Sequence, residues 1–186
     1  MKRLPRQFFA RPTKLVAREL LGKVLVRKIG NKKLSGMIVE TEAYVGPHDL
    51  ACHASKGKTE RTKVMFESAG TWYIYFIYGM YHCLNIVTEA KDYPSAVLIR
   101  ALEPLENIES STNGPAKLCR ALKIDRRLNS TSAISKSSKL YIEDREIAIP
   151  KNKIISAKRI GVDYAGKWKN KPLRFYIKEN KFVSKR

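Results

Sequence analysis

This sequence has few cysteines and few acidic residues, and it lacks long apolar runs. Its three cysteines, Cys52, Cys83 and Cys119, cannot form a complete disulfide framework, and none belongs to a C-x-x-C pair. No apolar run approaches the length of a membrane span, and residues 1–10 lack the apolar core of a signal peptide. We therefore expect an intracellular protein in a reducing compartment, without membrane association: cytoplasmic or nucleoid-associated in a prokaryote, nuclear in a eukaryote.

Motifs for metals and nucleotides are missing as well. Asn113–Lys117 contains glycine and lysine but lacks the spacing and the Ser/Thr of a phosphate-binding P-loop. The histidines and cysteines of the first half fit neither a structural zinc site nor the H-x-E…P-C-x-x-C signature of zinc base deaminases. These residues are His48, Cys52, His53, His82 and Cys83. The sequence therefore predicts no metal and no nucleotide or redox cofactor.

Positive charge is what the chain has in excess. Lysine and arginine outnumber aspartate and glutamate by 37 to 17, which gives a formal net charge of +20 and an isoelectric point near 10.0. Hydrophobic residues make up 44% of the chain, which is typical of a folded protein rather than a disordered basic tail. The expected partner is a polyanion such as nucleic acid. The alternative is a lysine-rich surface that only interacts with solvent.

Hydrophobic periodicity and turn residues predict one α+β domain over residues 1–186, because no linker or repeat divides the chain. We expect helices at 12–21 and 113–122, loops at 45–63 and 129–139, and a largely antiparallel, curved β-sheet flanked by the short helices. The hairpin over 72–88 should protrude with an aromatic tip, and Pro104 should follow the end of a strand. The expected strands are 23–29, 34–44, 72–77, 82–88, 95–102, 140–143, 147–149 and 173–177.

Two carboxylates stand two residues apart in the strand predicted at 34–44. Strand alternation places Glu40 and Glu42 on one face, with Cα atoms roughly 6.5–7 Å apart. Such a pair can hydrolyse a glycosidic bond, one carboxylate as base and the other as acid. The alternative is an exposed strand end with ordinary surface charges. Spacing alone does not say which glutamate is the base.

Tyrosines are concentrated between residues 73 and 81. Tyr73 and Tyr81 fit packing within a sheet. Tyr78 precedes Gly79 at the expected hairpin turn, where its own sheet cannot bury the ring. Exposed aromatic rings on basic proteins stack on bases or wedge between base steps. Tyr78 is therefore the predicted wedge.

Taken together, several segments resemble the mammalian-type alkyladenine (3-methyladenine) DNA glycosylase family over nearly the whole length. The chain departs from the usual pattern at Arg61-Thr62, where the family commonly has Arg-Asn, and at Ala116, where Gly or Ser is usual. The matching segments are Leu20–Val26, Ile38–Tyr44, Gly46–Asp49, Met65–Phe66, Tyr73–Tyr81, Leu98–Pro104, Asn113–Cys119, Arg159–Gly161 and Pro172–Tyr176.

The resemblance implies a monofunctional base-excision repair enzyme, acting as a monomer and without a cofactor. Its expected partner is double-stranded DNA that contains alkylated or deaminated purines: 3-methyladenine, 7-methylguanine, hypoxanthine or ethenoadenine. The damaged base is flipped out of the duplex, its N-glycosidic bond is hydrolysed, and an abasic site is left.

The same resemblance implies roles for individual residues. Glu42 is implied as the general base that activates water, Arg100 as the residue that helps hold that water, and Glu40 as a supporting residue. Around the flipped base it implies Tyr44, His53 and Tyr75 as sandwiching residues, Asn85 at the pocket floor as the group that rejects guanine, and Tyr78 in the gap left in the duplex.

Two alternatives remain at this point. The chain could be a non-catalytic nucleic-acid-binding module whose aromatics hold unpaired bases and in which Glu42 is incidental. It could also be a glycosylase/lyase in which one of the many lysines attacks C1′ of the sugar. Release of free base separates the first from an enzyme, and a borohydride-trapped adduct identifies the second.

Overall fold

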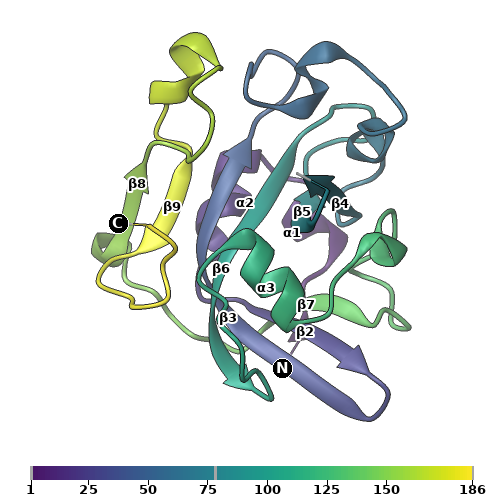
Figure 1. The fold of residues 1–186 in the computed structure, drawn as a ribbon, viewed down its shortest axis with the longest axis vertical. Helices are drawn as coiled ribbons and strands as arrows, with labels where there is room; N and C mark the ends of the chain where they lie inside the picture. Colours follow the sequence, from purple (N-terminus) through teal and green to yellow (C-terminus); the bar gives the residue numbers. More distant parts are fainter. Residues whose placement is uncertain (1, 78, 186) are drawn as a thin grey trace.

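A single curved sheet of nine strands forms the centre of the computed structural model, which describes residues 2–77 and 79–185 (Figure 1). The strand order is β1-β7-β2-β3-β6-β5-β4, and β9 pairs with both β3 and β8. Every strand pair is antiparallel, which confirms the predicted fold class. The strands are β1 (Lys2–Arg3), β2 (Val24–Ile29), β3 (Lys32–Tyr44), β4 (Trp72–Ile77), β5 (Tyr81–Val87), β6 (Ala96–Glu106), β7 (Leu140–Asp144), β8 (Ile154–Ala157) and β9 (Arg174–Ile177).

Short helices flank the sheet, and two of them agree with the sequence prediction. Pro115 is the first residue of α3, where its missing N–H leaves no hydrogen bond unmade. The turn that follows α2 ends at Gly22, whose φ of +86° is accessible to glycine and strained for other residues. The α-helices are α1 (Arg6–Phe9), α2 (Thr13–Glu19) and α3 (Pro115–Ala121); the 3₁₀ helices are η1 (His53–Lys56), η2 (Lys63–Phe66), η3 (Arg126–Leu128), η4 (Lys151–Lys153) and η5 (Gly166–Asn170).

The two longest strands, β3 and β6, run side by side through the middle of the molecule (Figure 1). The other edge of β3 pairs with β2 along its first half and with β9 along its second half. On one face of β3, the Thr41 hydroxyl donates to the carbonyl of Ala17 in α2. On the opposite face of the sheet, α3 covers β5 and β6 (Figure 1). The C-terminal half of β3 is therefore paired along both edges and covered by α2 on one face.

Several details differ from the sequence prediction. Pro104 does not end its strand: β6 continues to Glu106, and Pro104 pairs with Gly36 at a register shift, where a residue without an N–H is tolerated. Residues 147–149 are not a strand, and the strand of this region lies at 154–157 instead. The segment 129–139 is irregular, as predicted, and it is anchored because Ala133 is buried in the core.

The predicted hairpin is present as the antiparallel pair of β4 and β5, in register from Trp72 opposite Ile86 to Ile77 opposite Tyr81. At its turn the Met80 N–H donates to the Ile77 carbonyl at 3.2 Å. Tyr78, the predicted wedge, lies outside the described residues, so its insertion into DNA stays a prediction. Across the described segments, no helix combines the length and the apolar character that a membrane crossing requires.

Candidate active site

Irregular pairing between β3 and β6 shapes the region around the two predicted carboxylates. The register of the two strands shifts on both sides of Glu40, which leaves Val39 and Arg100 without partners in the ladder. Such bulges redirect side chains and are frequent beside active sites. Residues 40–42 pair without interruption with β9, so Glu40 and Glu42 keep the shared face that the alternation predicted.

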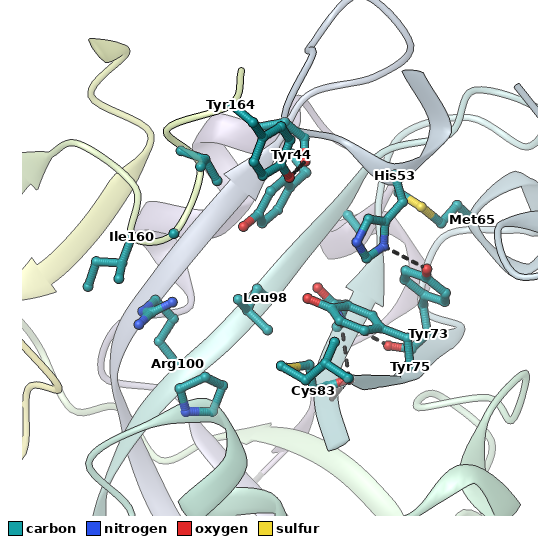
Figure 2. A pocket seen from close by; sticks show the side chains of 17 residues that line it. Tyr44, His53, Met65, Tyr73, Tyr75, Cys83, Leu98, Arg100, Ile160 and Tyr164 are labelled. Atoms are coloured by element: carbon teal, nitrogen blue, oxygen red, sulfur yellow. Dashed lines mark hydrogen bonds between the residues drawn. The ribbon is translucent and has the colours of Figure 1, made fainter. Parts of the chain in front are cut away.

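A cavity of about 280 Å³ opens on this face of the sheet. In Figure 2, Tyr44 stands on one side of the cavity, His53 and Tyr75 stand on the other, and Leu98 lies between them. The lining residues come from four separate parts of the chain: Tyr44–His53, Met65–Asn85, Ala96–Pro115 and Ile160–Tyr164. The predicted residues Tyr44, His53, Tyr75, Asn85 and Arg100 all belong to this lining.

Glu42 is fully buried next to the cavity and is surrounded by hydrogen-bond donors. Its Oε1 accepts the N–H of Ile160 at 2.8 Å and lies 3.3 Å from Nη1 of Arg100. Its Oε2 accepts the Tyr44 hydroxyl at 2.9 Å. Two hydrogen bonds and an ion pair with Arg100 fit an ionised carboxylate, which accepts hydrogen bonds and donates none. Burial and the neighbouring Glu42 raise the pKa of Tyr44 well above its usual value, so Tyr44 stays a neutral donor.

Glu40 is also fully buried, which rules out the alternative of an exposed strand end with ordinary surface charges. Its Oε1 accepts Nε of Arg100 at 3.2 Å and Nη1 of Arg174 at 2.8 Å. Burial acts to lower the pKa of Arg100, but Glu42 and Glu40 outweigh it and raise that pKa. The two carboxylates therefore share one guanidinium, with Glu42 on the cavity side of it.

The wall opposite Tyr44 is built from three aromatic rings that pack edge to face or tilted. The rings of His53 and Tyr75 meet edge to face at 4.5 Å, and those of Tyr73 and Tyr75 lie 5.4 Å apart. His53 Nδ1 and the Tyr73 hydroxyl are 2.9 Å apart. Burial, with a smaller effect of Arg61, lowers the pKa of His53 to about 4, so the imidazole is neutral at physiological pH. This wall therefore presents aromatic rings without a charge of its own.

Asn85 is buried on β5, among the residues that line the cavity. Its Nδ2 donates to the carbonyls of Tyr73 and Cys83 at 3.1 and 3.3 Å. These two contacts hold the side-chain amide in one orientation. Cys83 lies beside it, and burial raises the pKa of that thiol, so the thiol stays protonated.

A buried ion pair joins two distant loops behind Tyr44. Nη1 and Nη2 of Arg159 donate to the two carboxylate oxygens of Asp49 at 2.6 and 2.8 Å, and both side chains are fully buried. The guanidinium of Arg159 also lies 4.7 Å from the centre of the Tyr44 ring. The loop after β3 and the segment that carries Ile160 are therefore held together at the cavity.

The histidines and cysteines considered for zinc are dispersed. The ring centres of His48 and Trp168 lie 5.4 Å apart and those of His82 and Phe76 lie 4.8 Å apart, both pairs tilted, while His53 contacts Tyr73. In the part of the chain that the structure describes, no three His, Cys, Asp or Glu side chains are grouped to hold a metal ion.

Sequence reasoning missed two kinds of site residue. Tyr73 looked like sheet packing, yet it lines the cavity and contacts His53. Arg174 and the Asp49–Arg159 pair carry no local signal, because their partners are more than 100 residues away in sequence. The family resemblance of the segments 46–49, 159–161 and 172–176 was the only available indication of their importance.

Comparison with known proteins agrees with this geometry. Residues 7–181 match the family model described as Methylpurine-DNA glycosylase (MPG). The chain is 53% identical over 189 residues to a Legionella pneumophila (strain Corby) protein named "Putative 3-methyladenine DNA glycosylase", with all of both chains covered. Proteins of the same name from Clostridium perfringens (strain 13 / Type A) and Methanocella arvoryzae are 49% and 50% identical, covering 99% and 98% of this chain and 100% and 96% of theirs.

Proposed function

This chain belongs to the methylpurine-DNA glycosylase family, and from that premise we propose that it excises damaged purines from double-stranded DNA with Glu42 as the general base. The chain is a DNA glycosylase, a hydrolase of N-glycosyl bonds. The observation that carries the proposal is the buried Glu42 carboxylate, which is held by two hydrogen bonds and an ion pair beside an aromatic-walled cavity.

The cavity suits a flipped purine. Rotating a base out of the duplex costs a few kcal/mol, and this cost is smallest for damaged or mispaired bases. Stacking between Tyr44 on one side and His53 with Tyr75 on the other offsets it by about 1–3 kcal/mol per stacked base. Alkylation at N3 or N7 makes a purine cationic, which adds a cation–π attraction to the tyrosine faces. We propose 3-methyladenine, 7-methylguanine, hypoxanthine and ethenoadenine as substrates, with Asn85 rejecting guanine.

In the proposed reaction, water attacks C1′ from the side opposite the departing purine. Arg100 holds the water, and Glu42 takes its proton as the sugar develops oxocarbenium character. The Ile160 amide and the Tyr44 hydroxyl keep the carboxylate oriented, as their contacts with both oxygens indicate. The purine leaves with the electron pair of the glycosidic bond: a cationic purine leaves as a neutral base, and a neutral purine leaves as an anion that takes up a proton from solvent. An abasic site remains. We further propose that residues 1–186 act as one domain and as a monomer.

Substitution of Glu42 tests the assignment. Glu42→Gln keeps the size of the side chain but cannot accept the proton, so we expect single-turnover excision to fall by about 10²–10⁴-fold. Binding to lesion DNA should remain, because the aromatic walls are unchanged. The measurement is release of free base from duplexes that carry hypoxanthine, ethenoadenine or a methylated purine in separate reactions. An inactive Glu40→Gln beside a fully active Glu42→Gln would show that the base is misassigned.

The same reactions test the two alternatives. A non-catalytic binding module would bind these duplexes and release no base from any of them. A glycosylase/lyase would cut the strand without added base or heat, and borohydride would trap a covalent lysine adduct. We expect base release, an intact abasic strand and no adduct.

A further inference from the structure

The C-terminal segment 183–185 contacts the ion-pair network of the active site. Val183 is buried in the hydrophobic core, which anchors the segment. The Ser184 N–H then donates to Oε2 of Glu40 at 2.7 Å, and the Lys185 carbonyl accepts Nη1 of Arg174 at 2.7 Å. The Ser184 hydroxyl lies 3.4 Å from Nη2 of Arg100. The backbone of this segment therefore makes hydrogen bonds to Glu40 and Arg174, the ion-pair partners that lie next to Arg100 and Glu42.

These groups form a continuous chain of four charges: Glu42, Arg100, Glu40 and Arg174. The charges sum to zero, and none of the four side chains is more than 9% exposed. A buried charge that loses its partner is strongly destabilised, so each group in such a chain restrains its neighbour. Arg100 lines the cavity and also donates to Glu40. The orientation of its guanidinium therefore depends on the position of the Glu40 carboxylate.

Arg174 also restrains the backbone that carries Ile160, whose N–H donates to Glu42. Its Nε donates to the Lys158 carbonyl at 2.9 Å, two residues before Ile160. The Ile160 N–H is the donor to Oε1 of Glu42. Glu40 and the C-terminal segment thus restrain two of the three groups that contact Glu42. These two groups are the Arg100 guanidinium and the Ile160 amide.

We propose that residues 183–185, acting through Glu40 and Arg174, form a positioning element that directs Arg100 and the Ile160 amide at Glu42. This inference rests on the proposed function, because it assigns a task to residues that do not touch the substrate. Without the Ser184 amide or the Glu40 carboxylate, Arg100 turns toward Glu42 alone and no longer holds the attacking water. Small misplacements of reacting groups cost up to about 10²-fold in rate.

Two variants remove the restraint from different ends. Glu40→Gln removes the charge that Arg100 and Arg174 share. Ser184→Pro removes the N–H that Glu40 accepts, together with the hydroxyl near Nη2 of Arg100, at a half-buried position. We expect each to lower the single-turnover excision rate by about 10–100-fold. The dissociation constant for lesion DNA should change by less than about threefold, because neither residue lines the cavity. Glu40→Asp, which keeps the charge, should recover part of the rate.

Glu103→Gln is the matched control. Glu103 lies on β6, and its carboxylate accepts Nδ2 of Asn180 at 2.6 Å, so it also ties the C-terminal region to the sheet. This contact is made outside the chain of charges around Arg100. Glu103→Gln should therefore stay within about twofold of the wild-type rate, even if it lowers the unfolding temperature to the same extent as Ser184→Pro.

A double-mutant cycle with Arg100 distinguishes positioning from general stability. Glu40 acts through Arg100 and, by way of Arg174, through the Ile160 amide, so Glu40→Gln should slow an Arg100→Met enzyme clearly less than it slows the wild type. Equal effects of Glu40→Gln in both backgrounds, or a full rate in a folded Ser184→Pro, would overturn the proposal. A wild-type protein that releases no base would instead overturn the proposed function, so the two failures are distinguishable.

Discussion

His53 shows how burial changes a single side chain of the site. Its pKa is lowered to about 4 by burial and, to a smaller extent, by Arg61, while an exposed histidine titrates near 6.5. Between these values the unfolded chain binds more protons at this position than the folded one. The free energy of unfolding therefore rises with pH across this window and falls as the pH drops from about 6.5 to about 4.

This linkage predicts a measurable difference between two variants. His53→Gln removes the titrating group, so its unfolding temperature should decrease less than that of the wild type between pH 7.5 and pH 5.0. His48→Gln, which removes an exposed histidine, is the matched control for the loss of an imidazole outside the cavity. Differential scanning calorimetry at several pH values makes the comparison. A His53→Gln slope identical to that of the wild type would mean that His53 does not resist protonation in the folded protein.

At the scale of elements, the Asp49–Arg159 pair joins the loop after β3 to the segment that follows β8. Asp49→Asn leaves the Arg159 guanidinium buried without a counter-charge, and Nε of Arg159 already lacks a hydrogen-bond partner. We expect the free energy of unfolding to fall by about 3–5 kcal/mol. The double variant Asp49→Leu/Arg159→Met should lose less, because no unpaired charge remains. Denaturant unfolding measures the free energy of unfolding of both variants. A loss of less than about 1 kcal/mol in Asp49→Asn would contradict this account.

The hairpin of β4 and β5 carries the second prediction at this scale. Its described flanks expose Phe76 and Met80, and Tyr78 stands between them in the sequence. A ring that fills the vacated base position stabilises the extrahelical state by replacing lost stacking. Tyr78→Ala should therefore reduce base flipping, most for lesions that remain well paired, such as hypoxanthine. A fluorescent base analogue reports flipping directly. Unchanged amplitude in Tyr78→Ala would show that the residue is not the wedge.

At the scale of the whole molecule, the net charge of +20 predicts how binding responds to salt. Each phosphate contacted by lysine or arginine releases counterions, so the affinity for undamaged duplex should fall by roughly tenfold or more between low and physiological ionic strength. Fluorescence anisotropy at a series of salt concentrations gives the slope. A flat response would mean that the excess charge does not meet DNA.

The sequence by itself determined the fold class, most strands and both main helices. These follow from local signals: alternation along the strand to Tyr44, Gly79 between the two strands of the hairpin, and Pro115 at a helix start. The sequence failed where a distant partner overrides a local signal. Pro104 continues a strand because a register shift opposite Gly36 accommodates it.

For the site, the sequence determined which residue types were present, and resemblance to a family indicated their roles. Only the tertiary structure decided that both glutamates are buried and that they share Arg100. It also brought Ile160 and the C-terminal segment to them across more than 110 residues of sequence. The physical reason is that a strand pattern reports the face on which a side chain lies. The charge, hydrogen bonds and solvent that meet this face depend on segments that only the folded chain brings together.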